Sequence, residues 1–168
     1  MTHDLAWLNT LPAEEAAKEL LQCCGSRRWA REMANRRPYQ SLETLIKTAS
    51  DVWWSLQPDD WLEAFRSHPK IGEKKAAESV SAQSREWSGQ EQAGVSNAAQ
   101  ETVDSLATLN RAYEQKFGFI FIICATGKTS EEMLAALCER LEHDPVAELQ
   151  VAASEQSKIT ELRLRKLI

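Results

Sequence analysis

Apolar residues recur at intervals of three and four along most of this chain, which is the spacing of one face of an α-helix. The pattern is strongest over residues 42–53, where the apolar positions are Leu42, Leu45, Ile46, Ala49, Val52 and Trp53. Ser41 precedes this stretch as a potential cap, because its hydroxyl can accept a hydrogen bond from the first turn. The pattern therefore predicts a helix that begins directly after Ser41.

Proline and glycine mark further helix boundaries in the first half of the chain. Pro12 opens a stretch rich in Ala, Glu and Leu, which Gly25 can close as a C-terminal cap. Pro58 opens another helix, and Pro69 forces it to end because proline disfavours a helical backbone before it. Two more helices are therefore expected, one before and one after the helix that begins after Ser41.

The second half of the chain carries equally clear signals. A stripe of helical spacing over residues 88–117 predicts one long helix that Gly118 stops, with stripe positions Ala99, Val103, Leu106, Ala107, Asn110 and Tyr113. Thr129 with Glu132 has the spacing of a capping box, and Asp144 with the proline after it starts a last helix that runs almost to the final residue. We therefore expect an all-α fold, a single-domain multi-helix bundle of about seven to eight helices.

Two segments depart from this pattern. Residues 117–125 (FGFIFIICA) are β-branched and aromatic enough for a strand, but the chain has no second run of that kind to pair with it. They are expected to form a buried extended or partly helical connector. Residues 73–85 are rich in Ser, Glu and Lys and are expected to form a surface loop or a loosely held helix.

Size and charge exclude several functional classes. A chain of 168 residues with 43% hydrophobic residues fits one domain, residues 1–168, with one sizeable core. A net charge of -5 offers no positive field for nucleic acid or an anionic membrane. The chain has neither a signal-like start nor a run that could span a bilayer, so we expect a cytoplasmic location. The four cysteines lack a zinc spacing and are expected to be reduced, mostly packed in the core, with no metal bound.

The sequence Gly127-Lys128-Thr129 copies the end of a phosphate-binding loop. That loop needs a glycine five residues before its second one, and the residue here is Ile122. A helix-capping turn explains the three residues better than a nucleotide site does.

His68 lies between a helix end and a glycine turn, with an extended backbone imposed by Pro69. It is therefore either a titratable group presented for chemistry or a histidine that satisfies the last carbonyls of its helix. His3, near a terminus, and His143, beside a helix start, are expected to be structural.

Ser88, Glu91 and Gln92 stand at positions i, i+3 and i+4 of a predicted helix start. The spacing matches a capping box, which would make Ser88 and Glu91 structural. The same spacing gathers the three side chains where a helix N-terminus favours an anionic ligand, so a cap and a binding site could coexist.

Arg163 lies four residues after Ile159 and four before Leu167, on the apolar stripe of the last helix, whereas Arg165 points away from it. An inward arginine needs a partner, which is either a structural carboxylate, the carbonyls at the helix end or the carboxylate of a substrate.

Taken together, these segments resemble the 2-oxo-4-hydroxy-4-carboxy-5-ureidoimidazoline (OHCU) decarboxylase family. The resemblance rests on five motifs in order, namely Arg37-Pro38-Tyr39, His68-Pro69-x-Ile71-Gly72, Ser88-x-x-Glu91-Gln92-x-x-Val95, Phe117-Gly118-Phe119-x-Phe121 and Ile159-x-x-Leu162-Arg163-Leu164. It implies an all-helical homodimer without metal or organic cofactor that converts OHCU to (S)-allantoin and carbon dioxide, the last step from urate to allantoin in purine catabolism.

The resemblance also implies a role for each matching residue. His68 resembles the catalytic histidine and Glu91 its acidic partner. The remaining positions resemble groups that bind the substrate: Ser88, Gln92, Arg163 and the backbone of Phe119, Ile120, Phe121, Ile122 and Ile123. Many relatives have proline in place of Ile120. Two other functions fit the same features, a noncatalytic helical interaction module and a decarboxylase of a related cyclic ureide.

Overall fold

The computed structural model describes residues 2–71, 81–96 and 99–168, and these residues form helices α1 to α10 without a strand. The all-α prediction is confirmed, with more helices than the seven to eight expected. The chain divides into two compact units: the first contains residues 1–64 and 157–168, and the second contains residues 65–156. Helices α5 and α10 each run from one unit into the other, and each unit is described by itself.

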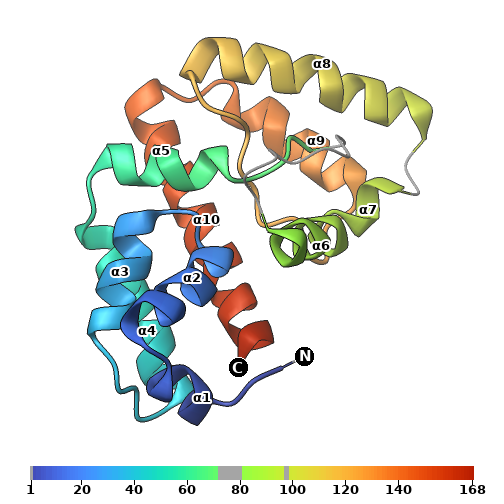
Figure 1. The fold of residues 1–168 in the computed structure, drawn as a ribbon. Coiled ribbons are helices and arrows are strands. Elements are labelled where there is room, and N and C mark those ends of the chain that lie inside the picture. Colours follow the sequence, from blue (N-terminus) through green and yellow to red (C-terminus); the bar gives the residue numbers. More distant parts are fainter. Residues whose placement is uncertain (1, 72–80, 97–98) are drawn as a thin grey trace. The chain divides into compact units, whose positions relative to one another are not determined.

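The first unit is built from α1 (Leu5–Thr10), α2 (Ala13–Cys23), α3 (Arg27–Asn35), α4 (Leu42–Ser55), most of α5 (Pro58–Arg66) and the end of α10 (Pro145–Leu167) (Figure 1). Its core contains two tryptophans whose indole N–H groups donate to backbone carbonyls. Trp29 of α3 donates to Ala49 of α4 at 3.1 Å, and Trp61 donates to Trp53 at 3.0 Å. These contacts fix α3 and α5 to α4.

Arg37 ties together three pieces of the first unit. Its guanidinium donates to the carbonyls of Ala34, Leu8 and Leu11 at 2.6–2.8 Å. Tyr39, two residues on, is buried and donates its hydroxyl to the Met33 carbonyl at 2.7 Å. The Arg-Pro-aromatic motif is thus a structural element in this unit.

The second unit contains α6 (Ala82–Glu91), α7 (Ala93–Ser96), α8 (Gln100–Phe117), α9 (Ser130–Arg140) and the start of α10. In Figure 1, α8 and α9 lie along each other, and the chain between them forms the connector. Their facing sides bury one cluster around the connector, with Leu106, Tyr113, Phe121, Met133 and Leu137 at its centre.

Several predicted boundaries are confirmed. Ser41 caps α4 by accepting from the Thr44 amide at 3.1 Å, and Asp144 caps α10. Gly118 closes α8 in the left-handed conformation, with φ of 80°, where a side chain would be strained.

The expected continuous helix over residues 88–117 is wrong. Ser81 caps α6 through the Ser84 amide at 3.1 Å, so that helix begins at Ala82, and Ser88 lies inside its last turns. The chain then passes through α7 before α8 begins at Gln100. Two short helices, α6 and α7, thus replace the first part of the expected one.

Gly25 does not cap α2, because that helix already ends at Cys23, with the Cys24 amide bonded to the Leu20 carbonyl. Ser26 then caps α3, a helix that the sequence pattern did not reveal. The predicted loop over residues 73–85 lies mostly outside the described residues; its last residues form the cap and first turn of α6.

The connector is confirmed as a buried segment without a strand partner among the described residues. Phe121, Ile122, Ile123, Cys124 and Ala125 are all buried.

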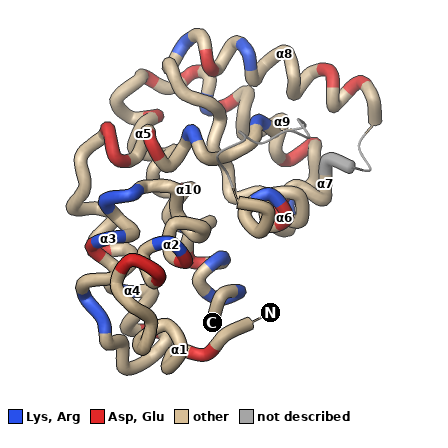
Figure 2. The backbone as a smooth tube through the Cα atoms, in the orientation of Figure 1, with Lys and Arg blue, Asp and Glu red and all other residues tan. Residues whose placement is uncertain are grey.

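Figure 2 shows acidic and basic positions interspersed along α8. None of the described helices is long and apolar enough to cross a bilayer.

Candidate active site

His68 is fixed at both its backbone and its ring. Helix α5 ends at Arg66, and the His68 amide donates to the Phe65 carbonyl at 3.1 Å. The half-buried ring places Nε2 2.7 Å from Oε1 of Gln156, a fully buried residue of α10. Position and orientation of the imidazole are therefore set from two sides.

Helix α8 holds the residues that follow His68. The Lys70 ammonium lies 2.8 Å from the Glu114 carboxylate, and the Asn110 amide donates to the Ile71 carbonyl at 3.4 Å. Asn110 was predicted to lie on the apolar stripe of its helix, and its buried position confirms this. The segment that carries His68 is thus tied to α8 as well as α10.

Ser88 and Glu91 are both buried in the last turns of α6, and Gln92 is the residue at its C-terminal cap. The expected placement at a helix N-terminus is therefore wrong. The C-terminal end of a helix carries partial negative charge and does not attract an anion. Any role of these side chains in binding has to come from their own hydroxyl, carboxyl and amide groups.

The charge of Glu91 acts on Cys124, near the end of the connector. Burial raises the pKa of the Cys124 thiol, and the nearby carboxylates of Glu155 and Glu91 raise it further, against the opposing charge of Lys128. Close packing supports the same placement, because a Cβ on Gly94 of α7 would collide with the carbonyl oxygen of Lys128. Sequence reasoning missed Gly94, whose role depends on this contact between distant segments.

A buried polar cluster around Glu148 supports the connector. The Glu148 carboxylate accepts from the Tyr113 hydroxyl at 2.5 Å, from Arg140 at 2.7 Å, and lies 2.9 Å from Nδ1 of His143. Arg140 also donates to the carbonyl of Ile122 at 2.6 Å. The expected structural role of His143 is confirmed, and the carbonyl of Ile122 already has a partner within the protein.

Arg163 belongs to the first unit. It is buried, with 3% exposed, and donates to the Gln22 carbonyl at 3.4 Å. Burial raises the pKa of the neighbouring Cys24 thiol to about 12, although the positive charge of Arg163 acts in the opposite direction. Arg165 is exposed and pairs with Glu161 at 3.0 Å, so the predicted difference between the two arginines is confirmed.

The Gly127-Lys128-Thr129 segment is the capping turn that the sequence favoured. Thr129 and Glu132 form a complete capping box at the start of α9. The Lys128 ammonium donates to the Cys124 carbonyl at 2.8 Å and so closes the turn after the connector.

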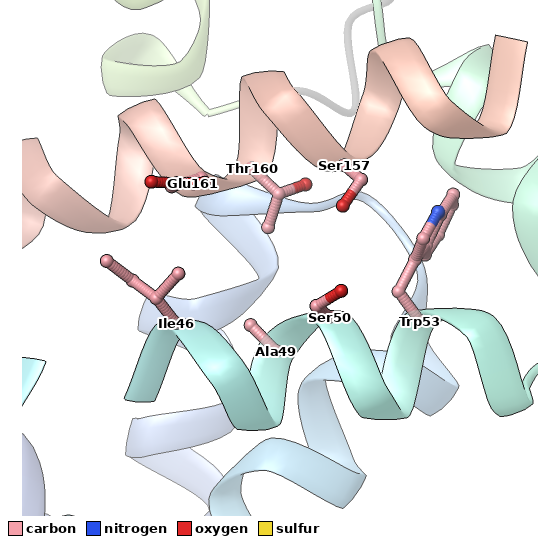
Figure 3. A pocket seen from close by; sticks show the side chains of 7 residues that line it. All are labelled: Ile46, Ala49, Ser50, Trp53, Ser157, Thr160 and Glu161. Atoms are coloured by element: carbon pink, nitrogen blue, oxygen red, sulfur yellow. The ribbon is translucent and has the colours of Figure 1, made fainter. Parts of the chain in front are cut away.

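One small cavity of about 60 Å³ lies between α4 and α10 in the first unit (Figure 3). Its walls are formed by Ile46, Ala49, Ser50, Trp53, Ser157, Thr160 and Glu161. This volume is large enough for only a few water molecules. None of the predicted site residues lines the cavity, so it is not the candidate site.

Among the described residues, no group of three or more His, Cys, Asp or Glu side chains is arranged to hold a metal ion. All four cysteines are free, as expected, and Cys138 is exposed while the other three are buried.

Comparison with known proteins decides the family. The sequence profile described as OHCU decarboxylase matches residues 9–165. This chain belongs to the OHCU decarboxylase family. A crystal structure of OHCU decarboxylase in the presence of (S)-allantoin is 42% identical, has a TM-score of 0.76, and covers 89% of this chain and 96% of that one.

Curated relatives agree with this family. The uric acid degradation bifunctional protein TTL of Arabidopsis thaliana is 44% identical over 86% of this chain and 45% of its own length. The 2-oxo-4-hydroxy-4-carboxy-5-ureidoimidazoline decarboxylase of Amia calva is 38% identical over 79% of this chain and 75% of its own length. The chain thus spans less than half the length of the bifunctional relative. His68, Glu91 and Arg163 all lie within the matched residues 9–165.

Proposed function

We propose that this protein decarboxylates OHCU to (S)-allantoin and carbon dioxide, the last step in converting urate to allantoin. The observation that carries the proposal is the family match over residues 9–165. The 42% identical structure obtained in the presence of (S)-allantoin supports the same product. Decarboxylation of a related cyclic ureide is the nearest competing activity.

The substrate itself makes a cofactor unnecessary. When the bond to the carboxylate breaks, its electron pair enters the adjacent ring C=N group, whose nitrogen takes up a proton. The product of this step is an enol. Transfer of a proton to the ring carbon that bears the ureido group then gives allantoin, while the hydroxyl loses its proton and becomes a carbonyl. We therefore propose catalysis without metal or organic cofactor.

His68 is the proposed proton-transfer group. An imidazole that titrates near neutral pH can accept the hydroxyl proton and return a proton to carbon. Its fixed ring, 2.7 Å from Gln156, suits delivery to one face of the enol. Glu91, buried at the end of α6, is its proposed acidic partner, which would stabilise the protonated ring.

The proposed binding groups are Ser88 and Gln92 on α6, Arg163 on α10, and the backbone of Phe119 to Ile123 in the connector. Arg163 supplies a guanidinium that can hold the substrate carboxylate in two parallel hydrogen bonds. Within the connector, the Ile122 carbonyl is bonded to Arg140, so the neighbouring backbone groups are the better candidates for the heterocycle. We further propose that the protein is cytoplasmic and forms a homodimer, and analytical ultracentrifugation can check the dimer.

The test is a coupled assay in which urate is oxidised and hydrated in place before the protein is added. We expect allantoin to appear faster than in the protein-free reaction, with a single sign of optical rotation, because a bound enol is protonated from one face. Prior treatment of the protein with a chelator is expected to leave the rate unchanged. A rate and a racemic product equal to those of the protein-free reaction would instead indicate a noncatalytic interaction module.

A further inference from the structure

The contact between His68 and Gln156 assigns the hydrogen on the imidazole ring. Oε1 of Gln156 lies 2.7 Å from Nε2 of His68. An amide oxygen is only an acceptor, so the ring nitrogen that faces it has to be the donor. In the neutral ring, the lone pair is then on Nδ1.

Gln156 is well placed to impose this arrangement. It is fully buried on α10, where its neighbours Ala152 and Ala153 are also fully buried. A buried side chain among packed neighbours has little freedom to rotate its amide. The His68 backbone is held independently through Phe65, so the amide orients a ring whose attachment point is already fixed.

The chemistry of an amide differs from that of the carboxylate that often orients a catalytic histidine. A carboxylate selects the same tautomer, but its negative charge also favours the protonated ring. An amide selects the tautomer and adds no net charge. The imidazole can therefore accept and release a proton without a fixed negative charge at this contact.

We propose that Gln156 is a positioning residue that holds His68 in the Nε2–H tautomer, so that Nδ1 is the nitrogen that exchanges a proton with the substrate. This inference rests on the proposed function of His68. It goes beyond that function by naming the reactive nitrogen and the residue that selects it.

The direct test is ¹⁵N NMR of histidine-labelled protein at a pH where His68 is neutral, with its signals assigned by their loss in His68→Asn. We expect a protonated, pyrrole-type Nε2 and an unprotonated, pyridine-type Nδ1. The reverse pattern would overturn the proposal. This readout does not depend on catalysis, so it stands even if the proposed reaction fails.

Two variants test the consequence for catalysis. Gln156→Leu keeps the volume but removes the acceptor, and we expect mixed tautomers and a kcat about 10- to 100-fold lower, with a smaller change in KM, as when a partner that orients a histidine is lost. Gln156→Glu keeps the tautomer but adds charge. It should raise the pKa of His68 and shift the acidic limb of the kcat/KM profile to higher pH.

Gln150→Glu is the matched control, because it makes the same change at an exposed position of α10 and should leave the profile unaltered. Urea unfolding of each variant separates a loss of fold from a loss of positioning. A folded Gln156→Leu protein with wild-type kcat and an unchanged tautomer would refute the proposal. If His68→Asn were inactive in that case, the proposed function would still stand.

Discussion

The second unit buries two polar clusters of opposite character. In the Glu148 cluster, a carboxylate with 0% exposed is surrounded by the hydroxyl of Tyr113, the guanidinium of Arg140 and the ring of His143. The charges of Arg140 and Glu148 neutralise each other. Arg140 also donates a further N–H group to the Ile122 carbonyl of the connector. In this cluster the charged groups bind one another and the connector, so their role is structural.

The His68 group is different, since a half-buried ring there meets a neutral amide at one nitrogen. This contact is compatible with both the neutral and the protonated ring, because Nε2 carries a hydrogen in both. Burial of titratable groups therefore does not by itself mark an active site. An opposite charge close to a titratable group favours the charged form of that group, whereas a neutral amide orients the ring without adding this bias.

The largest expected effect comes from breaking the closed cluster. Glu148→Gln removes the negative charge and leaves Arg140 buried without its counter-ion, which typically costs about 3–5 kcal/mol. Urea denaturation should show this loss of unfolding free energy. The control is Glu161→Gln, which removes an exposed carboxylate paired with Arg165 and should cost no more than about 0.5 kcal/mol. Equal stabilities for the two variants would contradict the structural role of Glu148.

Arg163 extends the comparison to a buried charge with a proposed ligand. Arg163→Ala should weaken substrate binding by about 1.5–3 kcal/mol, or roughly tenfold to over a hundredfold, through loss of a charge-assisted contact. Arg165→Ala removes the same charge from an exposed site and should leave KM unchanged. Steady-state kinetics, with unfolding free energies measured alongside, distinguish the two. Small and equal changes in KM would refute the assignment.

The two buried tyrosines show the same contrast between a charged and a neutral partner, with smaller expected effects. Tyr113 donates to a carboxylate and Tyr39 to a neutral carbonyl. Tyr113→Phe should therefore lose about 1.5–3 kcal/mol of unfolding free energy and Tyr39→Phe about 0.5–1.5 kcal/mol. A larger loss for Tyr39→Phe would contradict this ranking.

The contribution of Tyr39 to the unfolding free energy is expected to depend on pH in the alkaline range. Burial raises the pKa of Tyr39 from 10.0 to about 12, so its neutral form is favoured in the folded state. That contribution is fully present below pH 10 and is lost as pH rises towards 12. Tyr39→Phe should consequently show a shallower fall of unfolding free energy over this pH range than the wild type. An identical slope would rule out this titration as a source of alkaline instability.

Local chemistry explains which parts of the fold could be predicted. The Thr129–Glu132 capping box was predictable because both partners lie within one turn. Ser88 with Glu91 has the same spacing, yet the actual cap is Ser81. Two nearby serines offer similar local chemistry, and only the packing of the folded chain selects between them.

The candidate site was predictable where its residues break an apolar pattern, as Arg163 does on α10. Glu148 and Gln156 also lie on the buried face of that helix, so their polar side chains could have been identified in the same way. Their partners could not be predicted, because Tyr113 is 35 residues from Glu148 and His68 is 88 residues from Gln156. No local spacing encodes a contact over such distances.

The proposed role of His68 in proton transfer is tested by comparing His68→Asn with the wild type in the coupled urate assay, with optical rotation followed over time. Asparagine can still hydrogen-bond near the helix end, so the fold should persist. Loss of acid–base catalysis should slow the reaction by about 10²–10⁴-fold and give nearly racemic allantoin. His3→Asn, which changes a ring stacked on Trp7 in the first unit, is the control and should behave as wild type. A folded His68→Asn protein that made one enantiomer at the wild-type rate would contradict the proposed role of His68.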